Sequence, residues 1–282
     1  MSVTLPQVLA ALEHFAPLPL QEGWDNAGLQ VGLTEGADVS GALLCLDVTE
    51  AVVDEAAARG CNLVVSHHPL LFRGLKQLSM ADPVQRAVIK AVRGNIAVVS
   101  MHTNMDNAPG GVNWMMARRL GLGKCRFFGQ EKTCKVSVPE TVAVGVASAA
   151  QREVAGAPGV IGVLPEPVPS AMFVKAVKQA FGVECAMCNE LLRRPVHTVA
   201  LCGGAGDFLL PEAVSQQADA FITGEMHYHQ YFGYEQLLQI CVIGHYQSEQ
   251  YTIQLFSEIL AKACPTLPTY IAETNTNPII YL

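Results

Sequence analysis

Short apolar runs alternate with amphipathic segments over the first hundred residues. Apolar side chains recur at helical spacing over 4–15, 49–59 and 82–93, so we expect helices there. Gly60 and Gly94 directly follow the second and third of these segments and would end the helices. Continuous apolar runs predict buried strands over 41–47, 62–66 and 96–101. Strands and helices that alternate with short glycine turns are typical of an α/β fold with a largely parallel sheet.

The pattern changes between residues 125 and 168. Valine-rich runs over 135–138, 141–147 and 160–164 are separated by prolines around 158 and 165–169, which favours short antiparallel strands or hairpins. An α/β pattern then returns, with a helix over 172–181, strands over 198–202, 220–223 and 240–244, and a helix over 248–264. We therefore expect an α/β lobe over 1–124, a β-rich middle segment over 125–168 and a second α/β lobe over 169–282. Both lobes have the order strand, histidine-rich loop, helix, as a diverged duplication would.

Composition narrows the class of protein. The chain has 282 residues and a net charge of −7, which argues against nucleic-acid binding because such proteins normally carry a basic surface. No apolar run approaches the roughly 18 residues of a membrane span, and the N-terminus lacks the pattern of a secretory signal, so we expect a cytoplasmic protein without membrane contact. Half of the residues are apolar and only 15% are charged. This shortage of polar residues indicates self-association.

The nine cysteines are spread thinly through the chain, which is typical of reduced and mostly buried thiols. Cys185 and Cys188 form one C-x-x-C motif. A structural zinc site would need a second such pair or two well-spaced histidines, and only His197 is close in sequence. We therefore interpret these two thiols as incidental.

The histidines carry the clearest signal, because six of the eight follow predicted strands directly. They fall into four clusters: Ser66-His67-His68-Pro69, His102-Thr103-Asn104-Met105-Asp106, Gly224-Glu225-Met226-His227-Tyr228-His229 and Gly244-His245-Tyr246-Gln247-Ser248-Glu249. Ligands of open α/β sheets bind at the carboxyl ends of the strands. Each cluster alone has an ordinary alternative, such as a polar loop, an Asx turn or a helix pair. Four clusters of one ligand chemistry at strand ends together favour a metal site.

Imidazoles and carboxylates without thiolates suit zinc, manganese, iron or nickel. His245 and Glu249 are one helical turn apart and would share a helix face. The adjacent His67 and His68 cannot easily chelate one ion, but they could serve two ions with a carboxylate such as Asp106 between them. Paired ions of this kind lie about 3.5–4 Å apart and activate water.

Five ordered motifs resemble the dinuclear metal centre proteins known as GTP cyclohydrolase 1 type 2 homologs. The motifs are Trp24-Asp25-Asn26-Ala27-Gly28-Leu29-Gln30-Val31-Gly32, Ser66–Leu70, His102–Asp106 with Gly111-Val112-Asn113, Thr223-Gly224-Glu225, and Gly244-His245 with Glu249. The resemblance implies two intertwined α/β lobes with mixed sheets, a metal site between the lobes, and a ring-shaped homohexamer.

The resemblance also implies roles for individual residues. The metal ligands would be His67, His68, Asp106, His245 and Glu249, with Asp106 or Glu249 bridging two ions. His102 and His229 would lie beside the metals as proton-handling groups, and Asp25 and Asn26 would line the same pocket. Arg73 and Lys76 follow the His-His loop and could steer an anionic substrate, although a solvated loop explains them equally well.

These observations favour a metal-dependent hydrolase of a small, phosphate-bearing or nucleotide-like substrate. The glycine-rich run Cys202-Gly203-Gly204-Ala205-Gly206-Asp207 lacks the lysine of a phosphate-binding loop, so we expect a tight strand-to-helix turn there. The main alternative is a non-catalytic protein that stores, delivers or senses the metal, since holding an ion and using it require the same ligands. A purely structural metal is a third interpretation, although structural sites usually contain thiolates.

Overall fold

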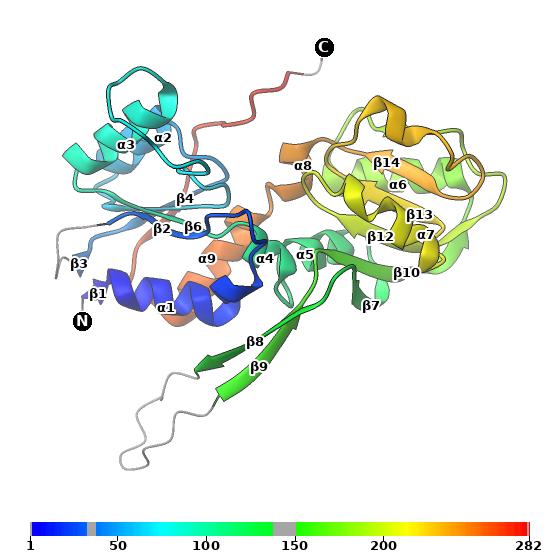
Figure 1. Ribbon diagram of the computed structural model, residues 1–282, viewed down its shortest axis with the longest axis horizontal. Helices are drawn as coiled ribbons and strands as arrows, with labels where there is room; N and C mark the ends of the chain where they lie inside the picture. Colours follow the sequence, from blue (N-terminus) through cyan, green and yellow to red (C-terminus); the bar gives the residue numbers. More distant parts are fainter. Residues whose placement is uncertain (1, 33–37, 138–150, 281) are drawn as a thin grey trace. The chain divides into compact units, whose positions relative to one another are not determined.

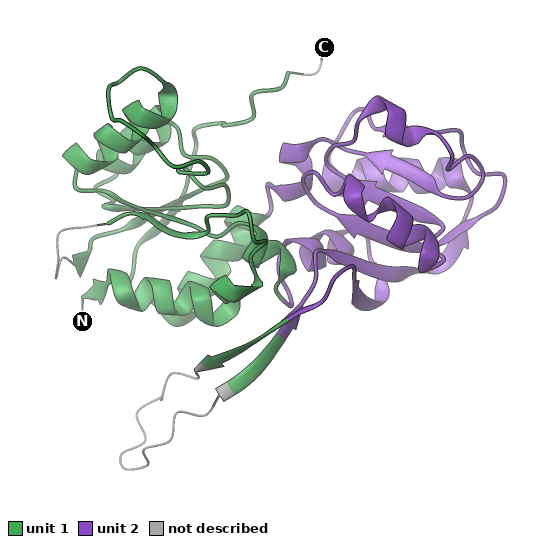
Figure 2. Cartoon of the chain, in the orientation of Figure 1, with its two compact units in different colours: residues 1–108, 133–154, 252–282 green, residues 109–132, 155–251 purple. Residues whose placement is uncertain are grey.

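The structure, a computed structural model, describes residues 2–32, 38–137, 151–280 and 282 (Figure 1). Contacts group the chain into two compact units (Figure 2). Unit 1 contains residues 1–108, 133–154 and 252–282, and unit 2 contains residues 109–132 and 155–251. Each unit is discontinuous in sequence, so the two are intertwined along the chain. The consecutive segments 1–124, 125–168 and 169–282 stay a prediction.

Unit 1 is built on a five-stranded sheet with the order β15-β4-β5-β6-β2. The strands are β15 (Thr269–Ile271), β4 (Ala42–Cys45), β5 (Leu63–Ser66), β6 (Ala97–Ser100) and β2 (Gly28–Val31). All pairs are parallel except β2 with β6. Every residue of β4, β5 and β6 is buried, because helices cover both faces of the sheet.

The helices of unit 1 cover the sheet in two pairs. Helices α2 (Glu50–Ala58) and α3 (Pro83–Arg93) pack on one face, where Val52 and Val88 join Val64 in a buried cluster. Helices α1 (Leu5–Phe15) and α9 (Thr252–Ala263) pack together on the other face (Figure 1). Helix α2 starts where the sequence predicts because the Thr49 hydroxyl accepts a hydrogen bond from the Val52 N–H.

Unit 2 has a six-stranded mixed sheet with the order β11-β14-β13-β12-β10-β7. The strands are β11 (Met187–Cys188), β14 (Gln239–Val242), β13 (Ala220–Thr223), β12 (Val196–Cys202), β10 (Gly159–Val168) and β7 (Gly123–Phe128). The three strands β12, β13 and β14 are parallel neighbours, and the other pairs are antiparallel. Unit 1 therefore has four adjacent parallel strands and unit 2 has three, each within a mixed sheet, and the predicted α/β class is confirmed.

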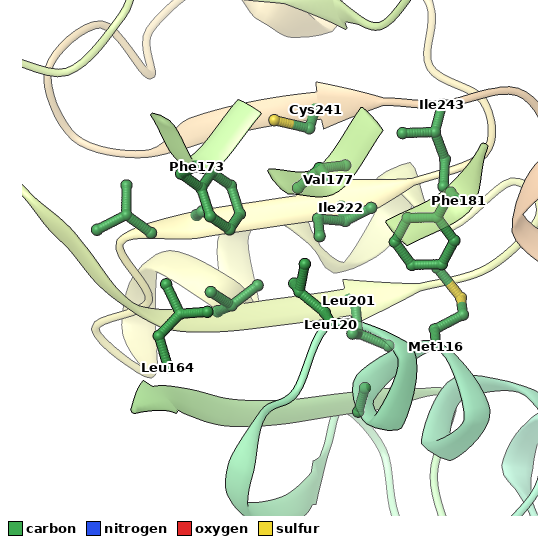
Figure 3. Close-up of a cluster of buried hydrophobic side chains, with 14 of the residues drawn as sticks. Met116, Leu120, Leu164, Phe173, Val177, Phe181, Leu201, Ile222, Cys241 and Ile243 are labelled. Atoms are coloured by element: carbon green, nitrogen blue, oxygen red, sulfur yellow. The ribbon is translucent and has the colours of Figure 1, made fainter. Parts of the chain in front are cut away.

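The core of unit 2 lies on both faces of its sheet. Helix α6 (Ser170–Phe181) places Phe173 and Phe181 over Ile222, in a cluster that helix α5 (Val112–Arg119) completes (Figure 3). The opposite face packs against helix α7 (Leu210–Ser215) through residues such as Phe221. Successive residues of β13 thus point to opposite faces, as the two-residue period of a strand requires.

The middle of the chain differs from the expected run of short hairpins. Strands β7 and β10 belong to the sheet of unit 2, whereas β8 (Lys132–Ser137) and β9 (Gln151–Gly156) pair only with each other among the described residues. Strand β10 continues through Pro165 and Pro167, where we expected a break, because its register against β12 shifts between Val163 and Val168. The expected strand over 141–147 and residue Val138 lie outside the described residues.

The helix expected over 248–264 is wrong as a single element, since the structure has α8 (His245–Glu249) and then α9. Tyr251, between them, belongs to the core of unit 2, whereas α9 belongs to unit 1, so the helix is divided where the chain changes units. The remaining short elements are β1 (Val3–Thr4), β3 (Asp38–Val39), α4 (Thr103–Asn107), and the 3-10 turns η1 (Leu18–Leu20), η2 (Asp207–Leu209) and η3 (Tyr228–Tyr231). None of the helices in the described part of the chain is long and apolar enough to cross a bilayer.

Asp219 stabilises the start of β12 next to β13. Its carboxylate accepts hydrogen bonds from the backbone N–H groups of His197 and Thr198 at 2.9 and 2.8 Å and pairs with Arg194. Burial opposes ionisation of this carboxyl, but the two N–H groups and the guanidinium lower its pKa below the usual value. Hydrogen bonds to a charged group contribute about 1.5–3 kcal/mol each.

Replacing Asp219 by asparagine should therefore lower the free energy of unfolding by about 1–3 kcal/mol at pH 7 in urea titrations. Because the folded pKa lies below the unfolded one, this stabilisation is present above the unfolded pKa and is lost as the pH falls through the folded pKa. The difference between the variant and the wild type should shrink in acid. Glu190→Gln, which breaks an exposed ion pair with Arg193, should change stability by less than about 1 kcal/mol; an equal loss in both variants would contradict this role of Asp219.

Candidate metal centre

Polar side chains follow three neighbouring parallel strands of unit 1. Asp47 comes after β4, His67 and His68 come after β5, and His102 comes after β6. The carboxyl ends of parallel strands meet at one edge of the sheet, so these side chains gather there.

The three histidines form a compact cluster at this edge. Their ring centroids are 5.0 Å apart for His67 and His68, 5.3 Å for His67 and His102, and 5.4 Å for His68 and His102. One ring nitrogen of each lies within 4.8 Å of the others. The His67 side chain is fully buried, and those of His68 and His102 are 23% and 13% exposed. The spacing allows the three imidazoles to share an ion.

A hydrogen bond holds the Nδ1 atom of each ring. Nδ1 of His67 lies 2.9 Å from the Met101 carbonyl, Nδ1 of His68 lies 2.7 Å from Asp47 Oδ1, and Nδ1 of His102 lies 2.7 Å from Asp25 Oδ1. A carbonyl or carboxylate oxygen accepts, so each Nδ1 carries the proton and each Nε2 has its lone pair for a ligand. Metal-binding histidines usually have such partners. The cluster therefore fits a divalent metal ion.

Two carboxylates in this hydrogen-bond network stay ionised at neutral pH. Burial alone would raise the pKa of Asp25, but hydrogen bonds from His102 and Thr103 lower it to about 2. Burial also opposes ionisation of Asp47, whose pKa is lowered by hydrogen bonds with His68 and Thr276. Each carboxylate therefore favours the Nδ1-protonated form of its histidine.

Asp106 supplies a further oxygen ligand beside the cluster. It lies on α4, the short helix that begins directly after His102, and its Oδ1 is 3.7 Å from Nε2 of His67. The structure thus brings together four of the residues predicted from sequence in unit 1: His67, His68, His102 and Asp106. The predicted pocket residue Asp25 lies in the same cluster through its bond to His102.

The loop around Asn26 and the loop after His68 lie next to each other. The Asn26 side-chain amide donates a hydrogen bond to the Leu71 carbonyl at 2.7 Å. Trp24 and Phe72, 62% and 46% exposed, lie with ring centroids 6.1 and 6.2 Å from that of His102. Sequence reasoning missed both aromatic residues as site candidates, although Trp24 directly precedes Asp25. The predicted anion-steering residues Arg73 and Lys76 are exposed on the second loop.

Unit 2 carries a matching arrangement around His245, which begins α8. Nδ1 of His245 lies 3.1 Å from Glu225 Oε1, and Nε2 lies 3.1 Å from Glu249 Oε2. The Glu249 side chain is only 4% exposed. As for two of the histidines in unit 1, a carboxylate at Nδ1 orients the ring. His245 and Glu249 thus lie side by side, as their spacing predicts.

Glycines make room for this pair. Gly244 has φ of +97°, which lets the chain turn sharply from β14 into α8. Gly204 has φ of +58°, and a Cβ atom there would collide with Oε1 of Glu249. The glycine-rich run after β12 is therefore a strand-to-helix turn, as the sequence indicates, and it allows close approach of Glu249.

Two acidic residues of the site escaped the sequence analysis as ligand supports. Asp47 and Glu225 each contact a predicted ligand, His68 and His245 respectively. Each comes two residues after a strand, β4 and β13 respectively. Glu225 stands in one of the four histidine-rich clusters named from the sequence, but no role was assigned to it there, and Asp47 was not named at all. His229, in contrast, is exposed, and its ring lies against Tyr228 and Phe232. Its role in proton handling stays a prediction.

Comparison with known proteins places this chain in a family. A family model described as Duf34/NIF3 (NGG1p interacting factor 3) matches residues 3–278. A GTP cyclohydrolase 1 type 2 homolog of Clostridium acetobutylicum is 28% identical over 284 residues, covering 99% of this chain and 98% of its own length. A protein of the same name from Clostridium perfringens is 31% identical over 246 residues, covering 87% and 86% of the two chains. The resemblance seen in the motifs is confirmed.

Solved structures agree with this assignment at the level of the fold. A hypothetical protein from Staphylococcus aureus is 25% identical with a TM-score of 0.84 and covers 100% of both chains. A Bacillus cereus protein related to NIF3 is 24% identical with a TM-score of 0.81 and covers 98% of both chains. Since the family match spans nearly the whole chain and relatives of similar length share its fold, this chain belongs to the Duf34/NIF3 family.

Proposed function

We propose that this protein is a dinuclear metal-dependent hydrolase of a small, phosphate-bearing or nucleotide-like substrate. The observation that carries the proposal is the cluster of His67, His68 and His102, whose Nδ1 atoms are all held by oxygen acceptors. Such outer partners raise the basicity of the ligand nitrogen and fix its direction. Three oriented imidazoles with ring nitrogens within 4.8 Å of one another are characteristic of a site that binds metal.

The proposed ligands are His67, His68, Asp106, His245 and Glu249, and Asp106 or Glu249 would bridge two divalent ions. This is the ligand set that the resemblance to the dinuclear metal centre proteins implies. Nitrogen and oxygen donors without thiolates suit zinc, manganese, iron or nickel.

Two bound ions would activate a water molecule and stabilise the charge that develops on a phosphoryl or carbonyl oxygen. The protein's own residues would hold and move the protons. His102 carries a proton on Nδ1, held there by Asp25, so its Nε2 can either accept a proton or serve as a ligand. His229 is the proposed second proton-handling residue.

Substrate binding follows from the two loops beside His102. Arg73 and Lys76 offer positive charge for an anionic group in a chain whose net charge is −7. Trp24 and Phe72 expose aromatic surface next to His102, on which a planar ring could stack. Phosphate recognition and ring stacking together favour a nucleotide-like molecule, and the related clostridial proteins carry the name of a GTP cyclohydrolase homolog.

A turnover screen with metal-loaded protein tests the proposal. Nucleotides, phosphoesters and cyclic amides would be incubated with the wild type, with Glu249→Gln and with the matched control Glu258→Gln, which changes an exposed residue of α9. We expect a hydrolysis product, identified by mass spectrometry, from the wild type and the control but not from Glu249→Gln. Bound metal without any turnover above that of Glu249→Gln would refute the hydrolase and favour metal storage, delivery or sensing.

We further propose that the chain acts in the cytoplasm as a homo-oligomer, with a hexameric ring as the expected assembly. The loop after His68 supports self-association, since Leu75, Leu78 and Met80 are all exposed on it. Light scattering at micromolar concentration should give about six times the chain mass of 30.2 kDa. A monomer under these conditions would contradict the proposed assembly.

A further inference from the structure

Cys188 and Cys241 face each other across a pair of antiparallel strands in unit 2. They are directly opposite residues in the register of β11 and β14, and their sulfur atoms lie 3.8 Å apart. Figure 3 shows Cys241 on the face of β14 that α6 covers. Both side chains are free thiols in the structure.

We propose that Cys188 and Cys241 form a redox-active thiol pair that peroxides oxidise to a disulfide. The geometry allows the bond without a change of fold. Directly opposite residues in antiparallel strands have Cα atoms about 4.5–5.5 Å apart, which falls within the range of roughly 4.4–6.8 Å found in disulfides. The two sulfur atoms, now 3.8 Å apart, would have to approach to about 2.0 Å.

The two thiols have different environments, which assigns them different roles. Cys188 is partly exposed, whereas Cys241 is completely buried. The hydrogen bond shared with Cys241 lowers the pKa of Cys188, burial opposes this effect, and the charge of Lys178 adds to it. The same hydrogen bond, together with burial, raises the pKa of Cys241. Cys188 is therefore the thiolate that oxidants reach, and Cys241 is the thiol that resolves the product.

The reaction is balanced with hydrogen peroxide as the two-electron oxidant. The Cys188 thiolate attacks one peroxide oxygen, the O–O bond breaks, and a sulfenic acid and hydroxide form. The sulfur of Cys241 then attacks the sulfur of Cys188 and the S–O bond breaks. The Cys241 proton leaves with the departing hydroxide as water, so two thiols and one peroxide give one disulfide and two waters.

A bond within the C-x-x-C motif would instead join Cys188 to Cys185. Cys185 is exposed, and no sulfur contact joins it to Cys188 in the described residues. A disulfide between Cys188 and Cys241 would link the two-residue edge strand β11 covalently to β14, the strand that leads into His245. The proposal does not depend on the proposed hydrolase activity.

Thiol counting and peptide mapping on the full chain test this pair. After treatment with one equivalent of hydrogen peroxide and alkylation in denaturant, we expect the nine thiols of the chain to fall by two. Tandem mass spectrometry should locate a Cys188–Cys241 link that dithiothreitol reverses. Cys185→Ala is the matched control and should form the same link, whereas Cys241→Ala should not form a reversible intramolecular link at Cys188.

Three results would overturn the proposal, and each is read on the wild type, so none depends on the folding of a variant. The first is a Cys185–Cys188 disulfide. The second is nine unmodified thiols after excess peroxide. The third is sulfinic or sulfonic acid at Cys188 with no disulfide to Cys241.

Discussion

Alanine at His67 is expected to weaken metal binding by more than about 100-fold. Loss of a residue that only hydrogen-bonds to a metal ligand weakens binding by roughly 10–100-fold, and loss of the ligand itself should weaken it more. His67 is fully buried, and Nδ1 is committed to the Met101 carbonyl, so the ring offers only Nε2 to an ion. Alanine at this position removes that nitrogen and supplies no other ligand atom. His245→Ala should have the same effect, because His245 Nε2 lies beside Glu249. Metal competition titrations with a chromophoric chelator measure both losses.

Matched histidine variants separate ligand loss from general damage. His14→Ala in unit 1 and His197→Ala in unit 2 change histidines outside the cluster and should keep wild-type affinity. An alanine in place of the buried His67 could also destabilise the fold, so the nearly isosteric Asp106→Asn is a further test. This variant should also lose metal, while its thermal unfolding temperature stays close to that of the wild type. Wild-type affinity in His67→Ala and Asp106→Asn would refute the proposed ligand set.

Asparagine at Asp47 or at Asp25 should weaken metal binding by roughly 10–100-fold while the ligands themselves stay in place. The Asp47 carboxylate orients His68 and that of Asp25 orients His102, each through a contact of 2.7 Å to Nδ1. An amide can present its NH₂ group to the ring and so favour the wrong tautomer. Isothermal titration with zinc or manganese measures the change.

The control for this prediction is Asp54→Asn on α2. Asp54 also makes a contact of 2.7 Å, but its partner is Lys90 and its side chain is 64% exposed. Its replacement should leave metal affinity within about twofold of the wild type, as expected for a weak surface pair. If Asp47→Asn behaves like Asp54→Asn, the orienting role of Asp47 is wrong.

The sequence predicts much of the fold because the central strands are buried on both faces. The runs 63–65 and 220–222 are continuously apolar, and the structure has β5 and β13 there. Strand β2 was not predicted, since two of its four residues are buried and Leu29 is exposed, which gives no continuous apolar run. The division of the last helix into α8 and α9 was also not predicted, because it occurs where the chain passes from unit 2, at Tyr251, to unit 1.

The candidate site follows from sequence for a similar reason. Parallel strands carry residues such as His67 and His102 to one edge, so their order along the chain is enough to group them. Contacts that depend on the register between strands cannot be predicted from the order of residues along the chain. The partner of Cys188 is set by the pairing of a two-residue strand with β14, and no local pattern encodes it. The contact of Asn26 with Leu71 likewise joins two loops far apart in sequence.

The central claim is that the histidine and carboxylate clusters hold two metal ions. The most direct measurement is the metal content per chain, by inductively coupled plasma mass spectrometry, of protein loaded with zinc, manganese, iron or nickel and then dialysed. We expect about two ions per wild-type chain and fewer than about 0.2 in the double variant His67→Ala/His245→Ala, given the more than roughly 100-fold weaker binding at each ligand position. A wild-type chain that retains no metal, or a double variant that retains as much as the wild type, would contradict this account.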